Sequence, residues 1–263
     1  MIPLTEPYIT GKEKKYLLES IKSNCISTGK YVELFEKEFA TFVGSKYAVS
    51  VCNGTCGLHL ALKVLEVENY NNVIIPNYTF VATAEAVKYC TDDEELYKRM
   101  VKLRHHGESP TRYYHEEIGF NYRMSNINAA FGFAQLQNIE KIIKLKTRIK
   151  NRYDMLLLSS NLLSNGNIKI QQEYTKSETI NWLYTIEFKN AHMCKHVVHE
   201  LNINNIETRY LFYPINCLPP YGKNKCNSED LCNRVINLPS SPELRFKVQK
   251  KIINIIEGAL KNE

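Results

Sequence analysis

The order of helix and strand patterns along this chain of 263 residues predicts the α/β class. In the first ninety residues helix patterns alternate with short apolar strand patterns, an order typical of a parallel sheet covered by helices. The last third changes to a mixture that predicts a small α+β domain. We expect helices at 13–23, 31–42, 58–65, 79–88, 92–104, 124–136, 139–158, 192–201 and 242–260, and strands at 47–51, 73–75, 182–188 and 207–213.

Each element follows from its local pattern. In residues 31–42 the side chains of Leu34, Phe35 and Phe39 form one apolar stripe, and Gly44 ends the helix. Aspartate and glutamate crowd the first turn of 92–104, where the helix dipole favours negative charge. The long helix at 139–158 has a continuous stripe of isoleucine and leucine.

Composition excludes several classes of protein. Hydrophobic residues make up 44% of the chain and charged residues 24%, which are ordinary values for a globular protein. The net charge is +6, and the basic run at 141–152 lacks interleaved aromatic residues, so we expect no nucleic-acid partner. No apolar run approaches the ~20 residues of a membrane span, and no signal peptide is evident. We therefore expect a cytoplasmic protein with reduced cysteines and no membrane partner.

A strand, a turn and a helix at residues 47–65 suggest a phosphate site. The strand ends at Val51, the small residues Asn53-Gly54-Thr55 follow, and the helix then begins. The free backbone N–H groups and the positive dipole end of such a helix bind phosphate without a dedicated cation. By itself the pattern also fits an ordinary tight loop in a parallel sheet.

Three histidines imitate a metal site. His192, His196 and His199 fall on one face of the predicted helix at 192–201. Exposed histidines are common on helices, and a metal site usually takes a ligand from a second element. We therefore predict no metal.

Six segments of the chain together carry a resemblance to a known family. They are Ile2-Pro3-Leu4 with Thr28-Gly29-Lys30 and Phe35-Glu36, then Ala48 to Leu62, Ile75-Pro76 with Thr79 to Ala84, Leu103 to Gly107, Tyr114-His115 through Gly119 to Met124, and Ile206 to Arg209 with Phe212 to Pro214. In this order they resemble the DegT/DnrJ/EryC1/StrS family of sugar aminotransferases. The Phe212-Tyr213-Pro214 run is most similar to its perosamine-synthetase branch, although Asn216 stands where the family usually has histidine.

The resemblance implies a pyridoxal-phosphate-dependent transferase of fold type I. Residues 1–150 would be the remnant of the large cofactor-binding domain, with an incomplete sheet, and residues 151–263 the small α+β domain. The implied reaction moves an amino group from glutamate to a keto-sugar on a nucleotide, in nucleotide-sugar biosynthesis, and the implied assembly is a homodimer. Substrate partners are therefore a nucleotide-linked sugar and glutamate.

The resemblance also assigns site residues. Gly54, Thr55 and the backbone of Cys56 would hold the cofactor phosphate, and Phe80 would stack on its pyridine ring. Asn121 would reach the phosphate bound by the neighbouring subunit. Taken singly, Thr55 also suits a helix cap, Phe80 a core position, and Asn121 a turn or a cap for the following helix.

The segment that should carry the catalytic lysine is absent. Lys88-Tyr89-Cys90 runs directly into Thr91-Asp92-Asp93, although the family has roughly a hundred residues, about one domain, at this join between 90 and 91. Those residues include an acidic partner of the pyridine nitrogen and a Ser-Phe-x-x-x-Lys segment whose lysine binds the cofactor covalently. Lys88 lies in a helix pattern and is a poor substitute.

We therefore assign no catalytic residue and expect no covalent cofactor attachment. The first hypothesis is an inactive member of the aminotransferase family. The alternative is a pseudoenzyme that pairs with a full-length paralogue as a heterodimer. In either case the shortened sheet is expected to expose strand edges and to lower solubility.

Overall fold

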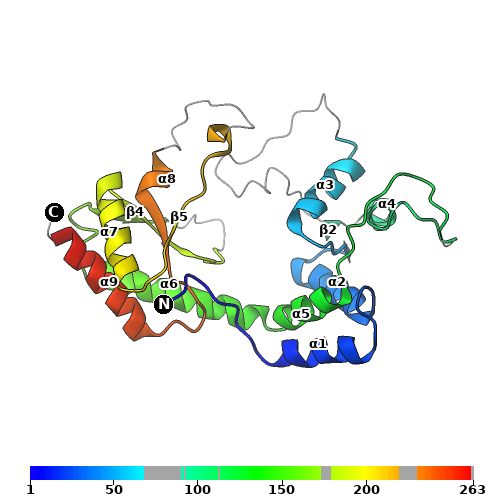
Figure 1. Ribbon diagram of the computed structural model, residues 1–263, viewed down its shortest axis with the longest axis horizontal. Helices are drawn as coiled ribbons and strands as arrows, with labels where there is room; N and C mark the ends of the chain where they lie inside the picture. The colour runs from blue at the N-terminus through cyan, green and yellow to red at the C-terminus, as the bar shows by residue number, and fades with distance from the viewer. Residues whose placement is uncertain (68–89, 92, 112, 173–178, 219–229, 262–263) are drawn as a thin grey trace. The chain divides into compact units, whose positions relative to one another are not determined.

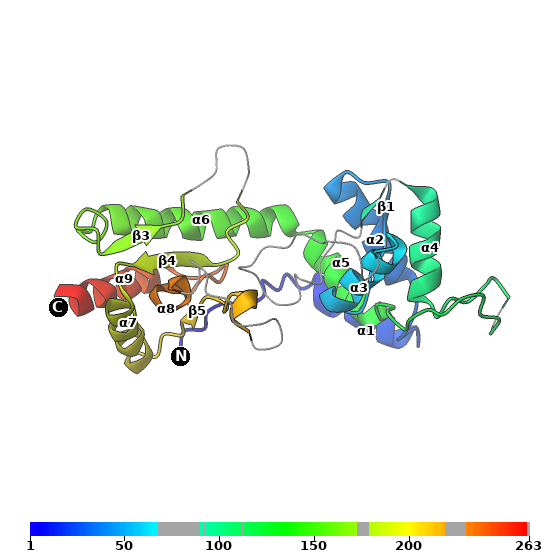
Figure 2. The same cartoon turned by 90° about the horizontal axis from the view of Figure 1, so that it is seen from above.

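The computed structural model describes residues 1–67, 90–91, 93–111, 113–172, 179–218 and 230–261 (Figures 1 and 2). These residues form two compact units. The N-terminal unit is Ile9–Asn138, and the C-terminal unit combines Met1–Tyr8 with Ile139–Glu263. The expected strand at 73–75 and helix at 79–88 lie outside the described residues. The predicted boundary at 150/151 falls within a helix of the C-terminal unit and stays a prediction.

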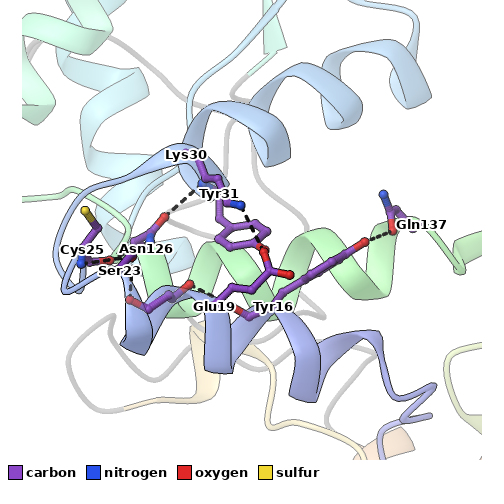
Figure 3. Close-up of polar contacts among 9 residues, drawn as sticks. Tyr16, Glu19, Ser23, Cys25, Lys30, Tyr31, Asn126 and Gln137 are labelled. Carbon is purple, nitrogen blue, oxygen red and sulfur yellow. Dashed lines mark hydrogen bonds and ion pairs between the residues drawn. The ribbon is translucent and has the colours of Figure 1, made fainter.

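Three helices build one half of the N-terminal unit: α1 (Lys12–Lys22), α2 (Lys30–Val43) and α5 (Asn126–Leu136). They pack around buried Tyr31 and the small residues Ala129 and Ala130. The Asn126 side chain accepts a hydrogen bond from the Tyr31 N–H at 3.0 Å and donates to the Cys25 carbonyl at 2.6 Å (Figure 3). This amide therefore fastens the start of α5 to the loop that leads into α2.

The hydroxyls of two tyrosines complete that helix packing. Tyr31 donates to Glu19 at 2.6 Å, and Tyr16 donates to Gln137 at 2.9 Å (Figure 3). Burial and the neighbouring Glu19 carboxylate raise the pKa of Tyr31, so its hydroxyl stays a donor. These polar groups are matched to one another within the unit, and they stabilise the helix packing.

The other half of the N-terminal unit contains a short sheet. Strand β1 (Tyr47–Ala48) pairs antiparallel with β2 (Cys90–Thr91), and helices α3 (Gly54–Val64) and α4 (Glu94–Arg104) pack beside it. The parallel neighbour that the sequence predicts for this strand, at 73–75, lies outside the described residues, so parallel pairing stays a prediction. Strand β2, which was not predicted, spans the join between 90 and 91 and runs along β1 in the opposite sense.

The C-terminal unit is a four-stranded antiparallel sheet with helices (Figures 1 and 2). In chain order the elements are α6 (Ile139–Leu158), β3 (Ile168–Ile170), β4 (Tyr184–Phe188), α7 (Ala191–Ile203), β5 (Arg209–Tyr210), the 3-10 helix η2 (Ile215–Cys217), α8 (Leu231–Arg234), β6 (Val235–Leu238) and α9 (Phe246–Lys261). The strand order is β3-β4-β6-β5. Tyr184, Ile186 and Phe188 of β4 share one core with the long helices α6, α7 and α9.

The first residues of the chain belong to this C-terminal unit. The Ile2 N–H donates to the Asn205 carbonyl at 2.7 Å, and the Glu207 N–H donates back to the Ile2 carbonyl at 3.0 Å. Leu4 is buried, and its carbonyl accepts from the Ser240 N–H at 2.8 Å. The segment Met1–Tyr8 therefore closes one side of a unit whose other residues lie far away in the sequence. In the described part of the chain, no helix is long and apolar enough to cross a membrane.

Candidate cofactor-binding site

The start of α3 is the candidate phosphate site. Asn53 is the N-cap, and its side-chain oxygen accepts a hydrogen bond from the Cys56 N–H at 2.9 Å. Because of this cap the helix begins at Gly54, four residues earlier than the apolar pattern predicts. Thr55 therefore lies in the first turn of the helix, with its N–H directed along the helix axis toward the N-terminus.

This helix end can receive an anion. Residues 52–55 are exposed, and a side chain added at Gly54 would meet open space. Among the residues that the structure describes, the N–H groups of Gly54 and Thr55 have no hydrogen-bond partner. The first turn has no acidic residue that would repel negative charge. Two free amides and the positive dipole end fit a phosphate group.

The backbone N–H of Cys56, which the resemblance assigns to the phosphate, is already used by the helix cap. It donates to the Asn53 side chain, so Gly54 and Thr55 supply the free N–H groups in this arrangement. Burial, with the Cys52 thiol nearby, raises the pKa of the Cys56 thiol. The roles of Gly54, Thr55 and Cys56 toward a cofactor stay predictions.

An aromatic layer lies beside the start of α3. The Phe120 and Tyr122 rings are stacked at 4.9 Å, and the His59 ring stands edge-on to Phe120 at 4.7 Å. His59 Nδ1 and the Tyr122 hydroxyl are 3.0 Å apart. The Cys52 N–H donates to the Tyr122 carbonyl at 2.9 Å, which fixes this layer to the loop before α3.

Burial, with the Cys56 and Cys52 thiols nearby, raises the pKa of Tyr122. Sequence reasoning did not select His59 or Tyr122, although both lie in segments that carry the family resemblance. Only their proximity in the fold brings them to the candidate site.

A buried ion pair holds the strand that leads to the site. Arg104 and Glu36 meet at 2.5 Å, with 12% and 14% of their side chains exposed. The same Glu36 oxygen accepts from the N–H and the hydroxyl of Ser50, both at 2.8 Å, and Arg104 donates to the Ser50 carbonyl at 2.7 Å. Helices α2 and α4 thus fix the backbone three residues before Asn53.

Of the other residues that the sequence analysis considered, Phe80 and Lys88 lie outside the described residues. Asn121 is exposed, its backbone forms a bridge with His105, and no hydrogen bond joins its side chain to Thr55. The alternative that Asn121 caps the following helix is wrong, because Ser125 caps α5 through the Asn128 N–H at 3.2 Å. The contact of Asn121 with a second subunit stays a prediction.

The three histidines of the C-terminal unit lie on α7. His192 and His199 are exposed, and His196 is half-buried. Within the described ranges, no group of three or more His, Cys, Asp or Glu side chains is placed to hold a metal ion.

Comparison with solved structures gives the class of fold. The PLP-form of the sugar aminotransferase Spr1654 from Streptococcus pneumoniae has a TM-score of 0.85 at 16% identity, over 99% of both chains. The chain therefore has the fold of the pyridoxal-phosphate-dependent sugar aminotransferases. It belongs to the DegT/DnrJ/EryC1/StrS aminotransferase family, which it matches over residues 7–91 and 88–257.

Two curated relatives span almost the whole chain. GDP-perosamine synthase of Escherichia coli O157:H7 is 27% identical over 98% of this chain and 97% of its own length. GDP-perosamine synthase of Vibrio cholerae is 26% identical over 98% of this chain and 99% of its own length. The first alignment runs over 363 positions and this chain has 263 residues, so at least 100 positions face no residue of this chain.

Proposed function

We propose that this chain is a nucleotide-sugar aminotransferase homologue that binds pyridoxal phosphate without covalent attachment and does not complete amino transfer. The observation that carries the proposal is the family match in two segments, 7–91 and 88–257, which meet at residues 88–91. The residues absent at that join are those in which the family resemblance places the catalytic lysine and the acid at the pyridine nitrogen.

The start of α3 suits the phosphate of the cofactor. The Gly54 and Thr55 N–H groups and the Thr55 hydroxyl are donors at an exposed helix end, and the Asn53 cap holds that turn in place. When bound, pyridoxal phosphate supplies an electron sink for reactions at an amino-bearing carbon. Such a reaction also needs a lysine that holds the cofactor and moves a proton, and no residue of this chain matches the family's lysine segment.

A pair of substitutions at Gly54 tests the phosphate site. Proline at the first helical position removes its N–H but keeps the helix, and the extended backbone of Asn53 tolerates a following proline. Gly54→Ala keeps the N–H, and its methyl group meets open space. Equilibrium dialysis with pyridoxal phosphate should show at least about tenfold weaker binding for Gly54→Pro and little change for Gly54→Ala.

Reduction with borohydride tests the missing covalent step. The protein is mixed with pyridoxal phosphate, reduced and mapped by peptide mass spectrometry, with a full-length GDP-perosamine synthase as the positive control. We expect a single labelled lysine in the control and no specific label here, together with no amino transfer from glutamate. A stoichiometric label at Lys88 that accompanies amino transfer would contradict the proposal.

The exposed loop before Asn121 favours the pseudoenzyme as a second candidate. Tyr113, Tyr114 and Ile118 are 74%, 62% and 90% exposed, and apolar surface of this kind is typical of partner contacts. Under this hypothesis the loop and Asn121 contact a full-length family member encoded by the same genome. Coexpression and size-exclusion chromatography would give a heterodimer, whereas the first hypothesis gives a homodimer or a monomer of this chain.

A further inference from the structure

We propose that the C-terminal unit has a binding site for a nucleoside phosphate, on the face of its sheet that points away from the hydrophobic core. The site is a cavity of about 270 Å³ lined by residues of β4, β5 and β6 and by the segments next to them. It lies wholly within the C-terminal unit and shares no residue with the candidate cofactor site at α3. The inference therefore does not depend on the proposed function.

A row of polar side chains crosses the sheet at this cavity. In the strand register Thr185 of β4 pairs with Asn237 of β6, and Asn237 pairs with Arg209 of β5. Residues that pair directly share one face of a sheet. On β4 the core residues Tyr184 and Ile186 flank Thr185 on either side in the sequence, so Thr185 points to the other face. The row therefore lies opposite the core.

Hydrogen bonds join the members of this row and leave further groups free. The Thr185 hydroxyl donates to the Asn237 side-chain oxygen at 2.8 Å, and the Asn237 side-chain nitrogen donates to the Arg209 carbonyl at 3.2 Å. The Asn237 amide, 7% exposed, keeps a second N–H and a second oxygen lone pair. Arg209 is exposed, and within the described ranges its guanidinium has no ion pair or hydrogen bond. The row thus offers neutral polar groups in its middle and a cation at one end.

Aromatic side chains line the same cavity. Trp182, 57% exposed, precedes β4, and Phe212 follows β5. The backbone at Trp182 is held by the buried Lys146, whose amino group donates to the Trp182 carbonyl at 2.6 Å and to the Ser240 carbonyl at 2.7 Å. The Tyr184 N–H donates to the Ser240 hydroxyl at 2.8 Å. The start of β4 is therefore fixed before a ligand binds, which lowers the entropic cost of binding.

A nucleoside phosphate matches this set of groups. Its base can stack on an exposed tryptophan, and carboxamide and hydroxyl groups pair with the donors and acceptors of the base and the ribose. A guanidinium binds phosphate through two parallel hydrogen bonds. Thr185, Asn237 and Arg209 lie on three adjacent strands, so the row extends about 10 Å. A base alone would leave Arg209 unused, and inorganic phosphate would leave Trp182 unused.

Tryptophan fluorescence reports on this site directly, because Trp182 is the only tryptophan of the chain. GDP and UDP are titrated into the full chain at neutral pH, with N-acetyltryptophanamide as the control for light absorption by the ligand. We expect saturable quenching by at least one nucleotide. The corresponding nucleoside should bind at least about tenfold more weakly, because it cannot contact Arg209 through a phosphate, and inorganic phosphate should not quench.

Three outcomes of these titrations would overturn the proposal. The first is that neither nucleotide quenches saturably. The second is that nucleoside and nucleotide bind equally, since the cation of the row then has no role. The third is that glucuronate, an acidic sugar without a base, quenches saturably while both nucleotides fail.

Variants separate the two ends of the site, with circular dichroism as the check of folding. Arg209→Ala should weaken binding of the nucleotide at least about tenfold and leave binding of the nucleoside unchanged. Lys195→Ala is the matched control, because it removes one exposed positive charge from α7, the helix that packs on the core face of the sheet. Thr185→Val should weaken both ligands, whereas Thr185→Ser keeps the hydroxyl and should weaken neither. Equal losses in Arg209→Ala and Lys195→Ala would mean non-specific attraction by charge and would refute the site.

The nucleotide can be free or linked to a sugar, and one further titration distinguishes these sources. In GDP-mannose and UDP-glucose a sugar covers the terminal phosphate that GDP and UDP leave free. Weaker quenching by the sugar-linked form identifies a free nucleotide as the ligand. Equal or tighter binding identifies a nucleotide-linked sugar.

Discussion

At the scale of single residues, Asn53 has the largest influence on the candidate site. One side chain caps α3 through the Cys56 N–H and contacts the Cys52 sulfur. The cap starts the helix at Gly54 and so turns the Gly54 and Thr55 N–H groups outward. Stability of the helix and geometry of the phosphate site therefore depend on the same amide.

Two substitutions of Asn53 separate these effects. Asn53→Ala removes the cap and should lower the free energy of unfolding by about 1 kcal/mol in urea titrations. Asn53→Asp keeps an oxygen acceptor and should unfold like the parent, but its charge should weaken binding of pyridoxal phosphate by electrostatic repulsion. Equal stability of all three proteins would mean that the cap does not hold the turn.

The sequence identifies part of this site. The Asn53-Gly54-Thr55 turn marks the candidate phosphate site. The apolar stripe starts only at Leu58, and the Asn53 cap that begins the helix earlier has no apolar signal. His59 and Tyr122 are 63 residues apart and meet only in the fold.

At the scale of elements, the Glu36–Arg104 ion pair and its hydrogen bonds to Ser50 connect α2 and α4 to the chain segment before the site. Both charged side chains are mostly buried, so each depends on the other for its charge. Removing one partner should cost more than removing both.

Glu36→Ala should lower the free energy of unfolding by about 3 kcal/mol or more, because it leaves the Arg104 charge buried without its partner. The double variant Glu36→Met, Arg104→Met should recover much of that loss. Lys98→Ala, which breaks an exposed pair on α4, is the control and should change little. Urea unfolding followed by circular dichroism measures all three. If the double variant loses as much free energy of unfolding as Glu36→Ala, the unpaired Arg104 charge is not the cause of the loss.

Tyr153 of α6 gives a prediction about pH. Its buried hydroxyl donates to the Pro239 carbonyl at 2.9 Å, and burial raises its pKa above the ordinary value of 10.0. A raised pKa stabilises the fold below pH 10, and this contribution is lost as pH rises further, by about 1.4 kcal/mol per pH unit. In urea titrations at pH 8 the free energy of unfolding of the parent should exceed that of Tyr153→Phe by about 1 kcal/mol. This difference in free energy should vanish near pH 11. A constant difference across this range would contradict the assignment.

Helices were predicted more closely than strands. The range 139–158 matches α6, and α1, α2 and α7 differ from their predicted ranges by one or two residues at each end. Strands β3 and β6 were not predicted. The first has three residues, and all four residues of the second are buried, so neither shows the alternation that marks a half-buried strand. Strand β2 was not predicted either, because it has only two residues, too few to show an alternating pattern.

At the scale of the whole molecule, each unit has a hydrophobic core of its own. The C-terminal core extends over α6, α7, α9 and the sheet, whereas Leu60 belongs to a smaller core around α3 and α4. The segment Met1–Tyr8 also belongs to the C-terminal unit, although in the sequence all of the N-terminal unit, Ile9–Asn138, separates it from Ile139. A change at Leu4 should therefore act on the unit that is distant in sequence.

The only tryptophan of the chain, Trp182, lies in the C-terminal unit and makes this testable. Leu4 is 1% exposed, and Leu4→Ala should destabilise the C-terminal unit by about 2–5 kcal/mol, which lowers the midpoint followed by tryptophan fluorescence. Leu60, 0% exposed, is the matched control in the other core. Leu60→Ala should leave the fluorescence midpoint unchanged and lower an earlier transition seen by circular dichroism. If both variants shift tryptophan fluorescence equally, the two units unfold as one, and the N-terminal segment has no special attachment to the C-terminal core.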